Sequence, residues 1–252
     1  WKPGAPAPVV FHHGIGTNLH IFDEWLPPIA WSRDIARFDF RGFGRSVAPM
    51  DGHRWTMDEL VDDVMEVASL AAGPKGRAHL VGESMGGTVV LLAAIRHPDR
   101  VASVTISNAA YKGPGINRVA GWREEIARDG MSGWADRMMD LRFKPGVLTD
   151  EKRRWFAAEQ ATSRAHVVLG LGELLAVQDL TAELPKLKAP LLMLMPSESP
   201  FVPLAQASEL AAMVPGSRLQ VFEGVRHGLP FSHGAACGEA LARELERLDP
   251  GA

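Results

Sequence analysis

The stretch "AHLVGESMGGTVVLLAAIR", residues 78–96, constrains the fold more than any other part of the sequence. Residues 78–82 form the short apolar run of a buried strand, and residues 85–96 have the composition of a buried helix. Ser84 lies where the strand must turn into the helix, and a side chain beside such a sharp turn would collide with neighbouring backbone. Three glycines surround the serine: Gly82, Gly86 and Gly87. The stretch therefore predicts a strand, a tight turn and a helix.

Strands and helices alternate on both sides of this unit. Short apolar runs predict further strands at residues 9–12, 35–40, 101–109, 189–196 and 217–224. Helical patterns lie at residues 56–72, 205–213 and 238–248. Thr56 and Glu59 form a capping box at the start of the first of these helices. This alternation predicts an α/β fold with a doubly wound, mostly parallel sheet.

The middle of the chain has a different character. Two helical stretches, at residues 122–143 and 150–176, are rich in Trp, Met and Arg, and no strand pattern separates them. We therefore interpret residues 111–186 as a helical cap inserted between two strands. Residues 1–110 and 187–252 then form the α/β core.

Composition excludes several classes of protein. The 252 residues carry a net charge of −3, and no basic run is present, which argues against a nucleic-acid-binding protein. The single cysteine, Cys237, allows no disulfide within the chain, and we expect a cytoplasmic protein. The longest apolar stretches are too short to span a membrane, so we expect no membrane partner.

The serine at the turn has the sequence context of a nucleophile. Residues 82–86 match the pattern G-x-S-x-G, with a predicted strand before it and a predicted helix after it. A serine needs a base, and His227 follows the last predicted strand, where the chain order serine, acid, histidine places the base. His233 is the second candidate. The pattern indicates nucleophilic catalysis by Ser84, with His227 as its base.

An oxyanion formed at this serine would need backbone N–H donors. Met85 follows the nucleophile at the start of the helix and provides one N–H group. The glycine-rich turn "HHGIG" after the first strand provides a second, which we assign to Ile15. We predict that Ile15 and Met85 form an oxyanion hole.

These motifs together resemble the α/β-hydrolase superfamily. "FHHGIG", "FDFRGFGRS", "VGESMGG" and "VFEGVRHG" occur in the order of that family. Within it, "GIGTNLHIFDEWLP", "SNAAYKG" and "DGMSGWADRMMDLRF" most resemble 3-oxoadipate enol-lactonases and related carboxylic-ester hydrolases. The resemblance implies attack of Ser84 on the carbonyl of a small ester or lactone, an acyl-enzyme, and its hydrolysis by water with His227 as the general base. It also implies no cofactor and no metal.

The sequence departs from the family at the acid of the triad. The resemblance implies an aspartate in the segment "PSESPFVP", but Ser199 stands at the aligned position. Glu198 is the adjacent carboxylate, and its longer side chain could reach the histidine, so we predict that Glu198 is the acid. Asp62, Asp63 and Asp179 belong to helical stretches and are poorer candidates.

The cap and the loops are expected to provide the substrate pocket. We predict that its lining includes Gly14, Trp122, Trp134, Met138 and Val202. Among the cap arginines, three could bind a substrate carboxylate: Arg137, Arg142 and Arg164.

Two alternatives to an ester or lactone hydrolase remain. One is a hydrolase that cleaves a C–C bond of a ring-fission diketone product, which uses the same serine and histidine. The other is a non-catalytic ligand-binding protein of the same fold, for which Ser199 is the only support. Haloalkane dehalogenation requires a carboxylate nucleophile, and position 84 is a serine.

Overall fold

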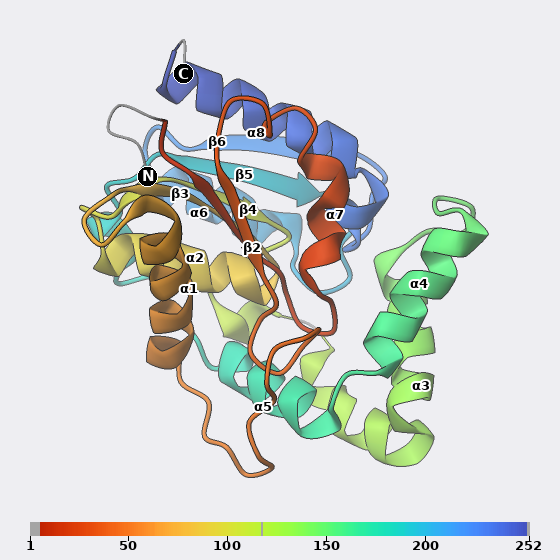
Figure 1. Cartoon of the computed structure of the whole chain (residues 1–252). Coiled ribbons are helices and arrows are strands. Elements are labelled where there is room, and N and C mark those ends of the chain that lie inside the picture. The colour runs from red at the N-terminus through yellow and green to blue at the C-terminus, as the bar shows by residue number, and fades with distance from the viewer. Residues whose placement is uncertain (1–5, 117, 251–252) are drawn as a thin grey trace.

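Six parallel strands form the central sheet of the computed structural model, which describes residues 6–116 and 118–250 (Figure 1). The strands are β1 (Val9–His12), β2 (Ile35–Phe38), β3 (Ala78–Glu83), β4 (Val101–Ser107), β5 (Leu191–Pro196) and β6 (Arg218–Phe222). Their order across the sheet is β2-β1-β3-β4-β5-β6. All five neighbouring pairs are parallel, which confirms the predicted fold class.

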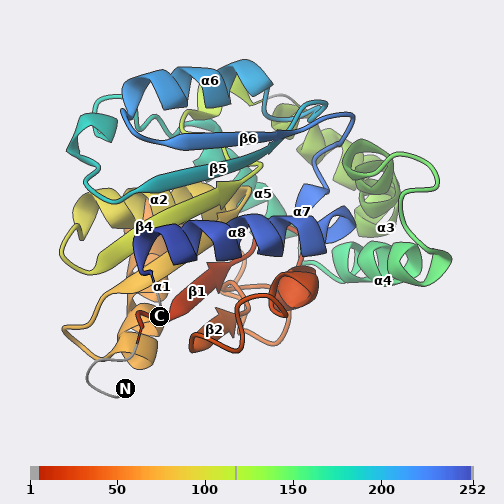
Figure 2. The same cartoon turned by 90° about the horizontal axis from the view of Figure 1, so that it is seen from above.

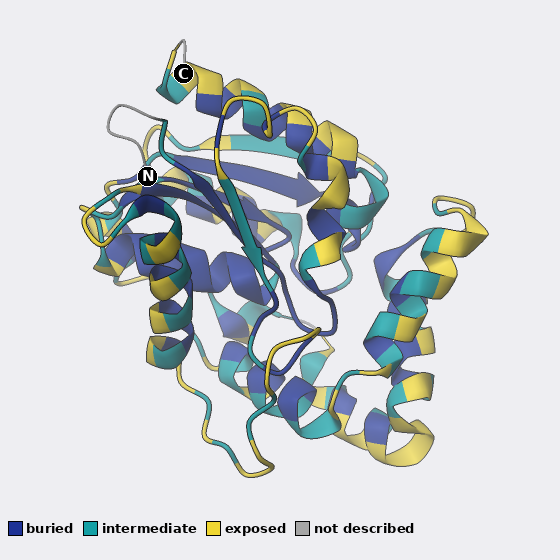
Figure 3. Cartoon of the chain, in the orientation of Figure 1, coloured by how far each residue is buried: buried dark blue, intermediate teal, exposed yellow. Residues whose placement is uncertain are grey.

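Helices cover both faces of the sheet because side chains alternate along each strand. Val10 and Leu80 point to the face covered by α1 (Met57–Ala72), α2 (Met85–Arg96) and α6 (Leu204–Met213). Phe11 and Val81 point to the other face, where α8 (Gly234–Leu248) packs with the 3₁₀ helix Leu19–Trp25. The four inner strands, β1, β3, β4 and β5, are buried, and the edge strands β2 and β6 are mostly half-buried. The outer sides of the helices are exposed (Figure 3). The sheet is therefore doubly wound.

Local sequence signals explain where these helices begin and end. The Oγ1 atom of Thr56 accepts a hydrogen bond from the backbone N–H of Glu59 at 3.2 Å, as the capping box predicts. Gly73 follows the last residue of α1 with a φ of 79°, a conformation that glycine adopts without steric strain. The predicted strand at 35–40 stops at Phe38, two residues earlier than expected.

Only helices and turns lie between β4 and β5 in the described residues, apart from one isolated bridge between Lys112 and Asp179. The helices are α3 (Trp122–Arg142), α4 (Asp150–Ala161) and α5 (Ala165–Ala176). Figure 2 shows α3 and α4 beyond the carboxyl ends of the strands, the edge at which β3 leads into α2. The predicted helical stretch 150–176 is divided in two, and Gly130 interrupts α3 with a φ of 67°. The limits 111 and 186 of a separate cap stay a prediction.

Three histidines are buried in the core as neutral rings. His13 Nε2 lies 2.7 Å from the backbone N–H donor of Phe40, and His79 Nδ1 lies 2.8 Å from Ser103 Oγ. Burial lowers the pKa of His12 to about 4, that of His13 to about 3 and that of His79 to about 4. These rings stay uncharged in the folded chain at a pH where the unfolded chain protonates them.

We expect the free energy of unfolding to fall when the pH is lowered from 7 to 5. The unfolded state binds more protons than the folded state between the lowered pKa values and about 6.5, so stability rises with pH across that window. Each of the three histidines lowers the free energy of unfolding by about 2 kcal/mol at pH 5, because it is protonated only in the unfolded chain. Urea unfolding at both pH values measures the change. A free energy of unfolding that is equal at pH 7 and pH 5 would contradict it.

Candidate active site

The turn between β3 and α2 holds Ser84 in a backbone conformation that few non-glycine residues adopt. Its φ is 52° and its ψ is −121°. The backbone N–H of Ser84 donates to the carbonyl of Ser107 at 2.9 Å, which fixes the turn to β4. A Cβ atom on any of the three nearby glycines would collide with a neighbour: Gly82 with the carbonyl of Gly86, Gly86 with that of His12, and Gly87 with the Cβ atom of Ala109. The glycines therefore leave space for a turn that presents the serine.

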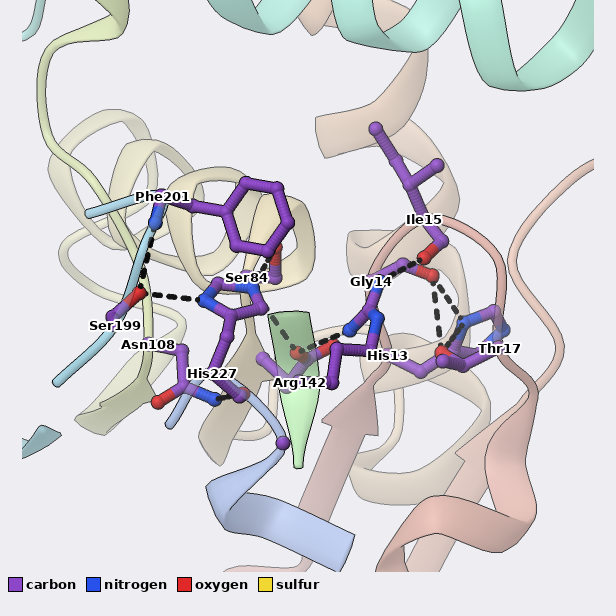
Figure 4. Close-up of polar contacts among 12 residues, drawn as sticks. His13, Gly14, Ile15, Thr17, Ser84, Asn108, Arg142, Ser199, Phe201 and His227 are labelled. Atoms are coloured by element: carbon purple, nitrogen blue, oxygen red, sulfur yellow. Dashed lines mark hydrogen bonds and ion pairs between the residues drawn. The ribbon is translucent and has the colours of Figure 1, made fainter. Parts of the chain in front are cut away.

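His227 lies beside this serine and is held on several sides. Its Nε2 atom is 3.3 Å from Ser84 Oγ, and Figure 4 shows the ring between Ser84 and Ser199. The Phe201 ring contacts it edge-on, with the ring centroids 4.7 Å apart. Asn108 donates a hydrogen bond from its side-chain amide to the His227 carbonyl. The structure thus brings together the serine and histidine predicted from the sequence, whereas His233 contacts Ser232.

Ser199 occupies the position from which a triad acid would orient the histidine. Its Oγ atom lies 3.0 Å from His227 Nδ1 and accepts hydrogen bonds from the backbone N–H groups of Phe201 and Val202 at 3.3 and 3.2 Å. Its hydroxyl can either donate to Nδ1 or accept from it, so the contact is compatible with the ring proton on Nε2 or on Nδ1. Only the tautomer with the proton on Nδ1 leaves Nε2 free to accept the serine proton. Ser199 therefore cannot fix the basic tautomer as a carboxylate would.

The structure corrects the prediction that Glu198 orients the histidine. Glu198 Oε2 lies 2.8 Å from Lys144 Nζ at the surface, and its side chain is 49% exposed. Its backbone N–H donates to the carbonyl of Val225 at 2.9 Å, which directs the following residue, Ser199, toward the ring. A carboxylate one position earlier therefore faces the surface.

Glu83, the residue before Ser84, forms a buried ion pair with Arg142. Glu83 is 2% exposed and Arg142 is 4% exposed, and their Oε1 and Nη1 atoms are 3.8 Å apart. Burial raises the pKa of Glu83 to about 7, and the nearby Arg142 acts in the opposite direction. Burial also lowers the pKa of His227 well below its ordinary value, and the positive charge of Arg142 lowers it further. His227 is therefore a neutral ring at pH 7.

Glu83 also approaches the histidine. Its Oε1 atom is 4.0 Å from His227 Nε2, the nitrogen that faces the serine. The sequence indicates that Glu83 is buried near the edge of the site, because it stands at the end of a central strand immediately before Ser84, but it gives Glu83 no role. Sequence reasoning missed Asn108 and Phe201.

The serine and histidine line a small cavity between the sheet edge and the helical insertion. Its volume is about 20 Å³, room for one water molecule. Of the predicted pocket residues, Trp122 and Val202 line it. Gly14 packs against Ser84: a Cβ atom on Gly14 would lie only 2.8 Å from Ser84 Cβ.

Two predicted pocket residues lie elsewhere. Trp134 and Met138 are 0% and 1% exposed, and neither lines the cavity in the described part of the chain. Trp134 packs edge-on against Trp122 with 5.4 Å between the ring centroids. Their position on α3 places them in the hydrophobic core, so the apolar stripe of this helix reflects packing.

One of the three candidate arginines reaches the cavity. Arg142 lines it and donates from Nη2 to the carbonyl of Ile15 at 3.0 Å. Arg137 instead pairs with Glu125 and Asp129 on the same helix. Arg164 precedes α5 and does not line the cavity. Arg142 therefore provides the positive charge at this site.

The predicted oxyanion donors are in suitable elements. Ile15 lines the cavity, and Met85 is the first residue of α2, directly after Ser84. The unpaired N–H groups at the start of a helix favour negative charge. The roles of both N–H groups stay predictions.

No group of three or more His, Cys, Asp or Glu side chains that could hold a metal ion occurs within residues 6–116 and 118–250. Over the same residues, no helix is both long enough and apolar enough to cross a membrane.

Comparison with known proteins identifies the family. Residues 7–234 match the model of the alpha/beta hydrolase fold, so the chain belongs to the α/β-hydrolase family. It is 27% identical to 3-oxoadipate enol-lactonase 2 of Acinetobacter baylyi over 85% of this chain and 80% of that protein. It is 28% identical to a 2-hydroxymuconate semialdehyde hydrolase of a Pseudomonas species over 99% of this chain and 90% of that protein.

The fold is also that of solved hydrolases. The enol-lactonase from Burkholderia xenovorans superposes with a TM-score of 0.84 at 24% sequence identity, and the match covers 97% of this chain and 93% of that one. The predicted resemblance to enol-lactonases is confirmed by these matches. Together they support hydrolase activity for this chain.

We expect Ser199→Asp to increase the rate of p-nitrophenyl acetate hydrolysis about tenfold. The new carboxylate would accept the Nδ1 proton of His227 and leave Nε2 free to accept the serine proton. The backbone N–H groups of Phe201 and Val202 would stabilise it. Initial rates of nitrophenolate release measure the effect.

Ser197→Asp is the matched control, because it adds the same charge in the same loop. Ser197 Oγ accepts from the backbone N–H of Gly224 at 2.9 Å and lies outside the histidine contact. An equal rate for Ser199→Asp and the unmodified chain would contradict the tautomer argument.

Proposed function

We propose that the chain hydrolyses a small carboxylic ester or lactone through an acyl-enzyme on Ser84. The observation that carries the proposal is the 3.3 Å contact between Ser84 Oγ and His227 Nε2 in a buried cavity. In the proposed reaction, His227 accepts the hydroxyl proton as Ser84 attacks the carbonyl carbon. The same proton then passes to the leaving alcohol oxygen, and a water molecule hydrolyses the ester bond to Ser84.

The backbone around the serine supports this mechanism. We propose that the N–H groups of Ile15 and Met85 bind the oxyanion of the tetrahedral intermediate. Gly14 leaves no side chain between the two loops, so a carbonyl oxygen can approach both groups.

Arg142 is positioned to bind a second functional group of the proposed substrate, a carboxylate. Its Nε atom is buried and has no hydrogen-bond partner in the part of the chain that the structure describes. A carboxylate on the substrate would supply a partner and a compensating charge. This supports an ester or lactone that also carries a free carboxylate, as in the 3-oxoadipate enol-lactonase relative.

Substrate entry requires movement, because the cavity holds about 20 Å³. Trp122 comes from the insertion and Phe201 from the loop after β5, and both line the cavity. Their rings are 6.4 Å apart between centroids. Rotation of these rings, or displacement of α3 from the sheet edge, would admit an acyl group.

A second candidate is hydrolysis of a C–C bond. The 2-hydroxymuconate semialdehyde hydrolase relative aligns with 99% of this chain and supports it. The same serine, histidine and arginine could serve that reaction. Rates measured side by side on simple esters and on a ring-fission diketone distinguish the two candidates, since the same serine and histidine could act on simple esters in either case.

We expect Ser84→Ala to remove at least 99.9% of p-nitrophenyl acetate and butyrate hydrolysis, because the acyl-enzyme cannot form. The Cβ atom is retained, so the turn should keep its conformation and the melting temperature should stay close to that of the unmodified chain. Nitrophenolate release by both chains measures the loss. Equal release by the variant would exclude Ser84 as the nucleophile.

A chain without ester turnover in either form would direct the search to C–C substrates. Binding of a diketone ring-fission product without its cleavage would support the non-catalytic alternative.

A further inference from the structure

A positive charge that forms on His227 during the reaction needs a compensating negative charge. When the ring accepts the proton of Ser84, a positive imidazolium forms in a buried space that already contains the Arg142 guanidinium. Two buried like charges oppose each other strongly. In a Ser-His-Asp triad the aspartate compensates the imidazolium. Here the neighbour at Nδ1 is the neutral hydroxyl of Ser199.

One carboxylate remains available to the ring. Within residues 6–116 and 118–250, Glu83 is the only acidic side chain with an oxygen within 4.0 Å of a ring nitrogen of His227. Its other oxygen, Oε2, is buried and has no hydrogen-bond partner among the described residues. A Cβ atom on Gly14 would collide with that same oxygen, so the side chain is closely confined.

The backbone places Glu83 there for a definite reason. It is the last residue of β3, and the turn at Ser84 follows at once, so both side chains lie at the carboxyl end of the strand. The loop after β6 brings His227 Nε2 to 3.3 Å from Ser84 Oγ and 4.0 Å from Glu83 Oε1. Arg142 approaches from α3 with its Nη1 atom 3.8 Å from Glu83 Oε1.

We propose that Glu83 is the electrostatic partner of His227 and replaces the missing triad aspartate from the Nε2 side of the ring. The inference rests on the proposed function of Ser84 and His227. The Ser84 proton moves to Nε2, the serine oxygen bonds to the substrate, and the carboxylate of Glu83 stabilises the imidazolium until the proton reaches the leaving oxygen. Glu83 is a positioning residue, since it acts through the histidine and forms no bond to the substrate.

The rate of serine attack should depend on pH. The groups that face Glu83 are Arg142 from α3, His227 after β6, the neutral amide of Asn108 after β4, and the backbone of Gly14 after β1. Glu83 supports the reaction only as a carboxylate, and its pKa is raised to about 7. The reaction rate should therefore increase about tenfold between pH 6 and pH 8. His227 has a pKa well below its ordinary value, so it does not titrate in this range.

The experiment measures phosphorylation of Ser84 by diethyl 4-nitrophenyl phosphate. Each attack by the serine releases one nitrophenolate and transfers its proton to His227, so the rate reports activation of the serine independently of any natural substrate. We expect Glu83→Gln to slow this step about 100-fold at pH 8 and to abolish the rise between pH 6 and pH 8. Glu198→Gln is the matched control, a surface carboxylate whose removal should leave the rate unchanged.

A double-mutant cycle separates this role from a structural one. Adding Ser199→Asp to Glu83→Gln should restore most of the loss of about 100-fold, because a carboxylate returns to the ring at Nδ1. The same substitution in the unmodified chain should give the smaller gain of about tenfold, since Glu83 already supplies the charge. Mass spectrometry confirms Ser84 as the modified residue, and melting temperatures show that each variant is folded.

The outcomes are distinct. A normal rate in Glu83→Gln, a loss that Ser199→Asp does not restore, or an unmodified chain whose Ser84 does not react would each overturn the proposal. A chain that shows the Glu83 dependence but hydrolyses no ester or lactone would retain the role of Glu83 and reject the proposed substrate class.

Discussion

The turn at Ser84 is the constraint on which the arrangement of the site depends. Strand β3 ends at Glu83 and α2 begins at Met85, so a single residue with a φ of 52° carries the change of direction. The backbone at the end of β1 can pack against this turn because residue 86 is a glycine: a Cβ atom there would lie 2.3 Å from the carbonyl oxygen of His12. The close contact brings the loop after β1 against the serine. The proposed nucleophile and the proposed oxyanion donors are thus placed by one local packing requirement.

Most of the core could be predicted from the sequence because its signals are local. The helix 85–96 and the strand 9–12 have the bounds that their apolar runs indicate. The insertion is less predictable, because Trp122 lines the cavity whereas Trp134 and Met138 on the same helix pack into the core. Periodicity shows that a helical face is buried but not which neighbour covers it.

The acid position shows a second limit of sequence reasoning. Glu198 is next to the position expected for the acid, but in an extended loop neighbouring side chains point in opposite directions. The backbone bond from Glu198 to Val225 sends Ser199 to the histidine and leaves Glu198 with Lys144. The approach of Glu83 to His227 joins the end of β3 to the loop after β6, which are far apart in sequence. Such a contact depends on the sheet order and on no local pattern.

The electrostatics of the site join the core to the insertion. Glu83 belongs to the sheet and Arg142 to the last turn of α3, so the 3.8 Å contact between them crosses from one part of the fold to the other. Any movement of α3 that admits substrate also changes the distance between these charges. A substrate carboxylate would pair with the Arg142 guanidinium in place of Glu83. The Glu83 carboxylate would then compensate the charge of the imidazolium. Substrate binding and serine activation would then be coupled through one arginine.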